Sequence, residues 1–118
     1  MAIRKLNLSG HDNADLASQN FDTFKLQVDL ADPSLQDKTL KFLIDTVGLK
    51  SDDTVIMAAP GLAPLAILIV TQVHGITGSF PTLVPLVRGS DGFTPGNPMD
   101  LQSVRMSARM DRADVTVL

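Results

Sequence analysis

The stretch that decides the fold is residues 54–74, which read TVIMAAPGLAPLAILIVTQVH. Residues 54–59 form an apolar run without polar alternation, a pattern typical of a strand that is covered on both faces. Pro60-Gly61 interrupts the run, and a helix is expected over residues 62–74, with Gly75 and Gly78 at its end. This helix is apolar around most of its circumference, so we expect it to lie deep in the protein or at a subunit interface.

Strands and helices alternate outward from this stretch. We expect strands at residues 3–8, 23–30 and 82–87, a helix from Asp32 to Gly48 whose apolar stripe is Leu40, Leu43, Ile44 and Val47, a mobile loop over 89–98, a helix from Asp100 to about Arg112, and a short strand at 115–118. This order favours a single α/β domain spanning residues 1–118. Its sheet is expected to be mostly parallel, with four to five strands and helices on both faces.

Composition narrows the function classes. The chain has 118 residues, 44% of them hydrophobic, enough for one core, and no cysteine, which excludes disulfides and thiolate chemistry. Two histidines and thirteen acidic residues, all aspartate, show no metal-ligand spacing, so we expect neither a metal nor another cofactor. The net charge of −3 argues against duplex nucleic acid as a partner. Without an apolar signal segment or a run long enough to cross a membrane, the protein is expected to be cytoplasmic.

Four chain segments that follow predicted strands are candidates for a binding site. They are Ser9-Gly10-His11, Asp29–Asp32, Pro60-Gly61 and Arg88-Gly89. Ligands of an open parallel sheet bind beyond the carboxyl ends of its strands, where these segments would meet. Glycine lets the backbone approach a ligand closely, and the free N–H groups at a helix start suit an anion. The sequence therefore predicts a site for a phosphate-bearing ligand.

The remaining basic side chains have two interpretations each. His11 is either a surface histidine or a ligand contact, whereas His74 fits a structural role in the last turn of its helix. Arg105, Arg109 and Arg112 form a stripe that either faces solvent at the helix end or reaches inward to a ligand. Met106 and Met110 lie on another side of that helix, which suggests a subunit contact.

Several of these segments together resemble one protein family. The resemblance is carried by residues 6–11 (LNLSGH), 60–63 (PGLA), His74-Gly75, 78–81 (GSFP) and Asp100-Leu101 with Val104-Arg105 and Arg109. In these residues the chain is similar to the small CRISPR-associated accessory proteins of type III systems. The match spans residues 6 to about 112 and is strongest from 60 to 81. It is looser at the start, where Gly10 stands between Ser9 and His11.

The resemblance implies a Rossmann-like homodimer that binds a cyclic oligoadenylate, most of all cyclic tetra-adenylate, across its two-fold axis. Apart from the resemblance, a ligand with two-fold symmetry on an exposed face could bridge two dimers into a higher assembly. With the segments at the strand ends included, the predicted ligand contacts are Asn7, Ser9, Gly10, His11, Pro60, Gly61, Leu62, Arg88, Arg105 and Arg109, and Phe93 is a candidate lid. Three functions stay open: sequestration of the messenger, its cleavage to linear di-adenylate by a metal-independent ring nuclease with Ser9 and His11 as catalytic candidates, and a structural or partner-binding dimer.

Overall fold

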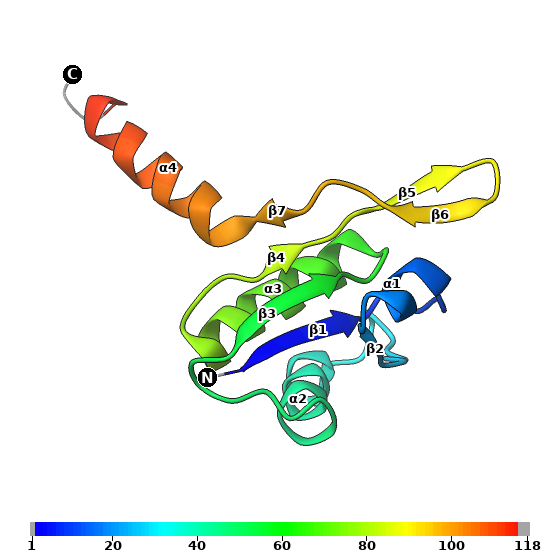
Figure 1. Cartoon of the computed structure of the whole chain (residues 1–118). Helices are drawn as coiled ribbons and strands as arrows, with labels where there is room; N and C mark the ends of the chain where they lie inside the picture. The colour runs from blue at the N-terminus through cyan, green and yellow to red at the C-terminus, as the bar shows by residue number, and fades with distance from the viewer. Residues whose placement is uncertain (1, 116–118) are drawn as a thin grey trace.

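A five-stranded sheet forms the centre of the computed structural model, which describes residues 2–115 and their side chains as far as Arg112. The strands are β1 (Ile3–Asn7), β2 (Asp22–Thr23), β3 (Thr54–Ala58), β4 (Thr82–Leu83) and β7 (Met99–Asp100), in the order β2-β1-β3-β4-β7 (Figure 1). The first four run parallel, and β7 is antiparallel to β4. The predicted α/β class and the mostly parallel sheet are confirmed.

Two helical segments cover one face of the sheet. They are α3 (Ala63–Thr77), and α2 (Leu35–Lys41) with the π-helical turn η1 (Phe42–Thr46) that continues it. The buried side chains between these helices and the sheet are Leu6 and Leu8, Val55 and Met57, Leu43 and Val47, Leu49, and Leu65, Ile69 and Val73. The helix expected over residues 62–74 is therefore real and buries one stripe. It runs through Gly75 and ends at Gly78, whose φ of 87° closes the last turn in the left-handed conformation that glycine favours.

The opposite face has a much smaller cover. The five-residue helix α1 (Ala14–Ser18) places Leu16 against Ala58 and Val84, with Phe21 completing this second cluster. At the other end of the same face, Ile3 is 65% exposed. The helices expected on both faces are thus unequal, and the carboxyl ends of the strands are the better covered part of this face.

The helix expected from Asp32 to Gly48 begins later and buries a different stripe. Residues 39, 43 and 47 are buried, whereas Leu40 and Ile44 of the predicted stripe are exposed. In η1 the N–H of Val47 donates to Phe42 O, five residues back, so the turn is wider than in an α-helix and the side chains rotate. Thr39 tolerates burial because its hydroxyl donates to the carbonyl oxygens of the preceding turn.

The strand expected at residues 23–30 is replaced by the two-residue strand β2, so that only Thr23 of the expected range pairs in the sheet. Beyond Thr23 the chain leaves the sheet, yet Phe24, Leu26 and Val28 still pack against the core while the residues between them are exposed. An alternation of apolar and polar residues indicates that one side of an extended chain is buried. It does not require hydrogen bonds to a neighbouring strand. The predicted strand was therefore wrong in its pairing and right in its buried side.

Residues 82–98 also differ from expectation. The single strand expected at 82–87 is broken at Pro85, which has no N–H to donate, into β4 and β5 (Leu86–Gly89). The expected mobile loop is mostly a hairpin, in which β5 pairs antiparallel with β6 (Gly92–Pro95) around a Ser90-Asp91 turn. Asp91-Gly92, an Asp-Gly pair between strand-forming residues, is the sequence signal that favours a hairpin over a mobile loop here. The hairpin extends beyond the edge of the main sheet (Figure 1).

The last helix, α4 (Leu101–Val115), projects away from the body (Figure 1). It is joined to the body at its start, where Leu101 N–H donates to Pro81 O and Phe80 N–H donates to Gln102 Oε1. The radius of gyration is 15.4 Å, against about 13.5 Å for a compact domain of this length, and the projecting helix accounts for the excess. The short strand expected at 115–118 lies outside the described residues apart from Val115, which belongs to α4.

Asp100 caps α4, as its sequence position predicted. Its carboxylate accepts the N–H groups of Gln102 and Ser103 at 3.0 and 3.2 Å and the Ser103 hydroxyl at 2.9 Å. The Ser103 hydroxyl, followed by these N–H groups, lowers the pKa of Asp100 below its ordinary 3.8. A lowered carboxyl pKa means that the cap stabilises the fold fully above pH 3.8 and is lost as the pH falls through the lowered value.

We therefore expect the Asp100 carboxyl to titrate below 3.8 when followed by side-chain carboxyl NMR, and Ser103→Ala to move its midpoint towards 3.8. Asp32 is an internal control, because its lowered pKa comes first from Lys38 and should not respond to this substitution. A wild-type midpoint at or above 3.8, or equal movement of both carboxyl groups in Ser103→Ala, would contradict this assignment.

Candidate functional site

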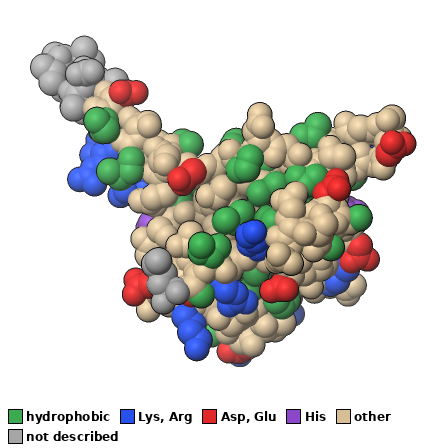
Figure 2. All heavy atoms as spheres, viewed as in Figure 1, with side chains coloured by type: hydrophobic (Ala, Val, Ile, Leu, Met, Phe, Trp, Pro, Cys, Tyr) green, Lys and Arg blue, Asp and Glu red, His purple; other side chains and the backbone are tan. Residues whose placement is uncertain are grey.

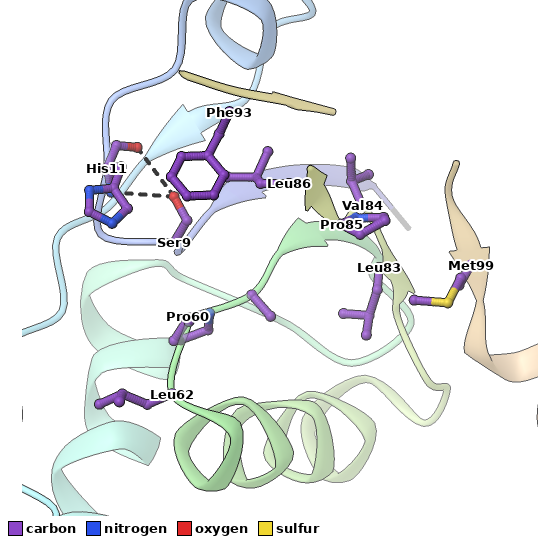
Figure 3. A pocket seen from close by; sticks show the side chains of 12 residues that line it. Ser9, His11, Pro60, Leu62, Leu83, Val84, Pro85, Leu86, Phe93 and Met99 are labelled. Carbon is purple, nitrogen blue, oxygen red and sulfur yellow. Dashed lines mark hydrogen bonds between the residues drawn. The ribbon is translucent and has the colours of Figure 1, made fainter. Parts of the chain in front are cut away.

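A cavity of about 520 Å³ lies at the carboxyl ends of β1, β3 and β4 (Figure 3). Its lining residues are Ser9 and His11 after β1, Ala59, Pro60, Gly61 and Leu62 after β3, Leu83, Val84, Pro85 and Leu86 around β4 and β5, Phe93 of β6, and Met99 of β7. Among these described residues, only Ser9 and His11 carry polar side chains. The site is therefore an apolar hollow with a small polar corner.

Pro60-Gly61-Leu62 forms the floor beside the start of α3. Leu62 is the N-cap and provides no side-chain hydrogen bond, and Pro64 stands in the first turn. Within the described part of the chain, the N–H groups of Gly61, Leu62 and Ala63 have no acceptor. Unpaired N–H groups at a helix start carry positive partial charge, so this floor suits an anionic group.

The turn Ser9-Gly10-His11 forms the polar corner, and a buried residue shapes it. Asn7 Oδ1 accepts the Ser9 N–H at 3.1 Å and the Ser9 hydroxyl at 2.6 Å, while Asn7 Nδ2 donates to His11 O at 2.8 Å and to Thr23 Oγ1 at 3.4 Å. Gly10 has a φ of 86°, which a residue with a Cβ rarely adopts. The turn therefore depends on both Asn7 and Gly10.

Two residues expected to contact the ligand have a different position. Asn7 is completely buried, and its amide is fully used within the turn, so it holds the site rather than facing the cavity. Gly10 does not line the cavity. It supplies the bend between Ser9 and His11, and these two residues do line it. Ser9, His11, Pro60, Gly61 and Leu62 all lie where the sequence placed them. The Asp29–Asp32 segment does not line the cavity, because β2 ends at Thr23.

The walls come from residues that the sequence did not single out, apart from Phe93. Leu83, Leu86 and Met99 lie across the cavity from the Pro60 turn (Figure 3). Phe93 is carried by the hairpin, and its carbonyl oxygen accepts Asn13 Nδ2 at 3.0 Å. Apolar residues near a proline are common in sequences, so they do not mark these residues as cavity walls. Only the positions of the hairpin and β7 in the fold show that they line the cavity.

The arginines are distributed unequally around the site. Arg88 lies on the hairpin opposite Phe93, with its guanidinium carbon 5.7 Å from the centre of the Phe93 ring, but it is not among the residues that line the cavity. Arg105 and Arg109 share one face of the projecting helix α4 with Arg112, and none of the three lines the cavity. Basic side chains gather on this part of the surface (Figure 2). The prediction that this arginine stripe reaches inward to a ligand is therefore wrong within one copy of the chain, because α4 projects away from the body (Figure 1).

Few groups suited to acid–base chemistry surround the cavity. His11 is exposed, and no carboxylate among the described residues is hydrogen bonded to its ring. The other histidine, His74, packs against Phe80 with ring centres 4.2 Å apart, a structural contact at the end of α3. Over residues 2–112, no group of three or more histidine and aspartate side chains is placed to hold a metal ion.

Comparisons with protein-family models, with curated proteins and with solved structures each returned no match. The fold and the cavity define the class of this protein, which is an α/β domain with an apolar cavity at the carboxyl edge of its sheet. Within the described residues, no helix is both long and apolar enough to cross a membrane.

Proposed function

We propose that this chain binds the cyclic tetra-adenylate messenger of type III CRISPR defence and attenuates signalling by sequestering it. The observation that carries the proposal is one cavity with apolar walls that borders the start of α3, where the N–H groups of its lining residues Gly61 and Leu62 have no acceptor among the described residues. Purine bases need apolar surface, and phosphates need N–H donors. The segments that resemble the accessory family at 6–11 and 60–63 meet at this cavity, on a sheet that we interpret as Rossmann-like.

The size of the cavity favours a ligand shared between two copies. A volume of about 520 Å³ is within the range of roughly 300–1,000 Å³ for small-molecule sites. A ring of four nucleotides with two-fold symmetry is larger than one such cavity, so each copy of a homodimer would receive half of it. Size-exclusion chromatography with and without ligand tests whether the dimer forms and whether ligand bridges dimers further.

Holding fits the site better than cutting. Metal-independent cleavage would use a ribose 2′-hydroxyl as nucleophile and needs in-line alignment with donors for the developing charge. The Ser9 hydroxyl already donates to Asn7 Oδ1, and no carboxylate among the described side chains is hydrogen bonded to His11 to orient it. A ring nuclease is the second candidate, because the exposed His11 borders the cavity within reach of a bound ligand.

A structural or partner-binding dimer is the third candidate. It predicts an occluded turn region without a concave site near Gly61. The cavity beside Gly61 therefore supports ligand binding over this alternative.

One experiment separates these functions. Labelled cyclic tetra-adenylate is incubated with excess protein, and the mixture is run on native and on denaturing gels. We expect a retarded complex from which intact ring is recovered. Recovery of linear di-adenylate would instead show that the protein cleaves the ring. The same experiment with His11→Ala would then show whether the histidine takes part in the cleavage. If the gels show neither retention nor conversion of cyclic tetra-adenylate, both functions are refuted.

A further inference from the structure

The rings of His11 and Phe93 are nearly parallel at the mouth of the cavity. Their planes differ by 11°, and their centres are 6.3 Å apart. This separation lies within the range of about 4.5–7 Å for interacting aromatic pairs, and two rings in one orientation present matching faces to a third planar ring. Phe93 is 45% exposed, although burial of its ring would be favourable. Both rings belong to the lining of the cavity (Figure 3).

The hairpin holds this pair of rings in place. Asn13 caps α1 by accepting the Leu16 N–H at its Oδ1, and its Nδ2 donates to Phe93 O at 3.0 Å. One side chain therefore ties β6 to the chain segment that carries His11. Arg88 lies directly across from Phe93 in the hairpin and places its cation 5.7 Å from the centre of that ring. A positive charge thus stands beside the aromatic pair.

We propose that His11 and Phe93 form a stacking platform for one purine base, with Arg88 placed to pair with a phosphate of the same nucleotide. The inference rests on the proposed function and adds the residues that determine base preference. Purines present a larger face than pyrimidines, and stacking on an aromatic side chain selects for face area rather than for hydrogen-bonding edges. The platform therefore prefers adenine over uracil without reading the edge of the base.

Substitution at Phe93 tests the platform. Stacking on an aromatic side chain contributes about 1–3 kcal/mol per base, so Phe93→Leu should weaken retention of cyclic tetra-adenylate about tenfold or more. It should also narrow the difference between cyclic tetra-adenylate and cyclic tetra-uridylate, because the uracil ring gains less from stacking. Phe93→Trp should preserve both the affinity and the preference.

Thr94→Ala is the matched control, since Thr94 is the next residue of β6 and is exposed on the opposite side of the hairpin. A direct readout is the aromatic NMR spectrum, in which the His11 ring protons should shift upfield when unmodified cyclic tetra-adenylate is added. Retention of cyclic tetra-adenylate without these shifts, or an unchanged adenine preference in Phe93→Leu, would overturn the platform and leave the proposed function intact. No retention by the wild type would overturn the proposed function and the platform with it.

Discussion

Asn7→Ala is expected to lower the free energy of unfolding by about 2 kcal/mol and to abolish ligand retention at micromolar protein. The substitution removes three hydrogen bonds that fix Ser9-Gly10-His11, two accepted and one donated by the buried amide, and a fourth that the amide donates to Thr23 Oγ1. Leaving the partners in this partly buried network unsatisfied costs about 1–3 kcal/mol. Urea denaturation followed by circular dichroism gives the stability change, and the native gel gives the retention.

Ser9→Ala is the graded control for this prediction. It removes one hydroxyl from the same network but leaves the Asn7 amide, the Ser9 N–H and the His11 carbonyl in place. Its stability loss should be less than half of that for Asn7→Ala, and retention should weaken without disappearing. Equal losses in the two variants would mean that the serine hydroxyl, rather than the buried amide, organises the turn.

The parts of the fold that the sequence predicted well are those whose signal is local. The run at 54–59 becomes β3, and the apolar segment after Pro60-Gly61 becomes α3, because each segment carries apolar side chains that pack into the core. Burial of α3 is limited to one stripe, and Ile67 on its other side is 67% exposed. The cap at Asp100 is local as well. The π-helical turn η1 is not, since a wider turn arises from packing and leaves no periodic mark in residues 42–46.

The candidate site divides in the same way. Turn residues such as Ser9 and Gly61 follow from strand ends and helix starts, so the rule for parallel sheets located them. Met99 and Leu86 line the cavity only because β7 pairs antiparallel with β4 and because the chain continues from β4 into the β5-β6 hairpin. The α4 arginines show the limit of periodicity: a stripe identifies which side chains share a face, whereas the direction of the helix decides what that face meets.

Gly61→Asp is expected to weaken retention of cyclic tetra-adenylate about thirtyfold, while Gly61→Asn weakens it less than threefold. A Cβ at Gly61 meets no atom within 4 Å, so both side chains fit without displacing the backbone. The aspartate carboxylate would compete for the unpaired N–H groups at the start of α3 and repel the phosphates of the ring. At about 5 Å and an effective dielectric constant near 20, repulsion between two unit charges is about 3 kcal/mol before screening by salt, and roughly 2 kcal/mol corresponds to thirtyfold.

The two effects of this aspartate have opposite signs, which makes the comparison decisive. A negative charge near the start of a helix favours the fold by about 0.3–1 kcal/mol, so Gly61→Asp should unfold at a urea concentration equal to or higher than that of Gly61→Asn. Weaker binding by the more stable variant cannot come from misfolding. The difference in retention should also shrink as salt is raised from about 50 to 500 mM, because screening acts on the phosphate repulsion. Equal retention by the two variants at low salt would place the phosphates away from the start of α3.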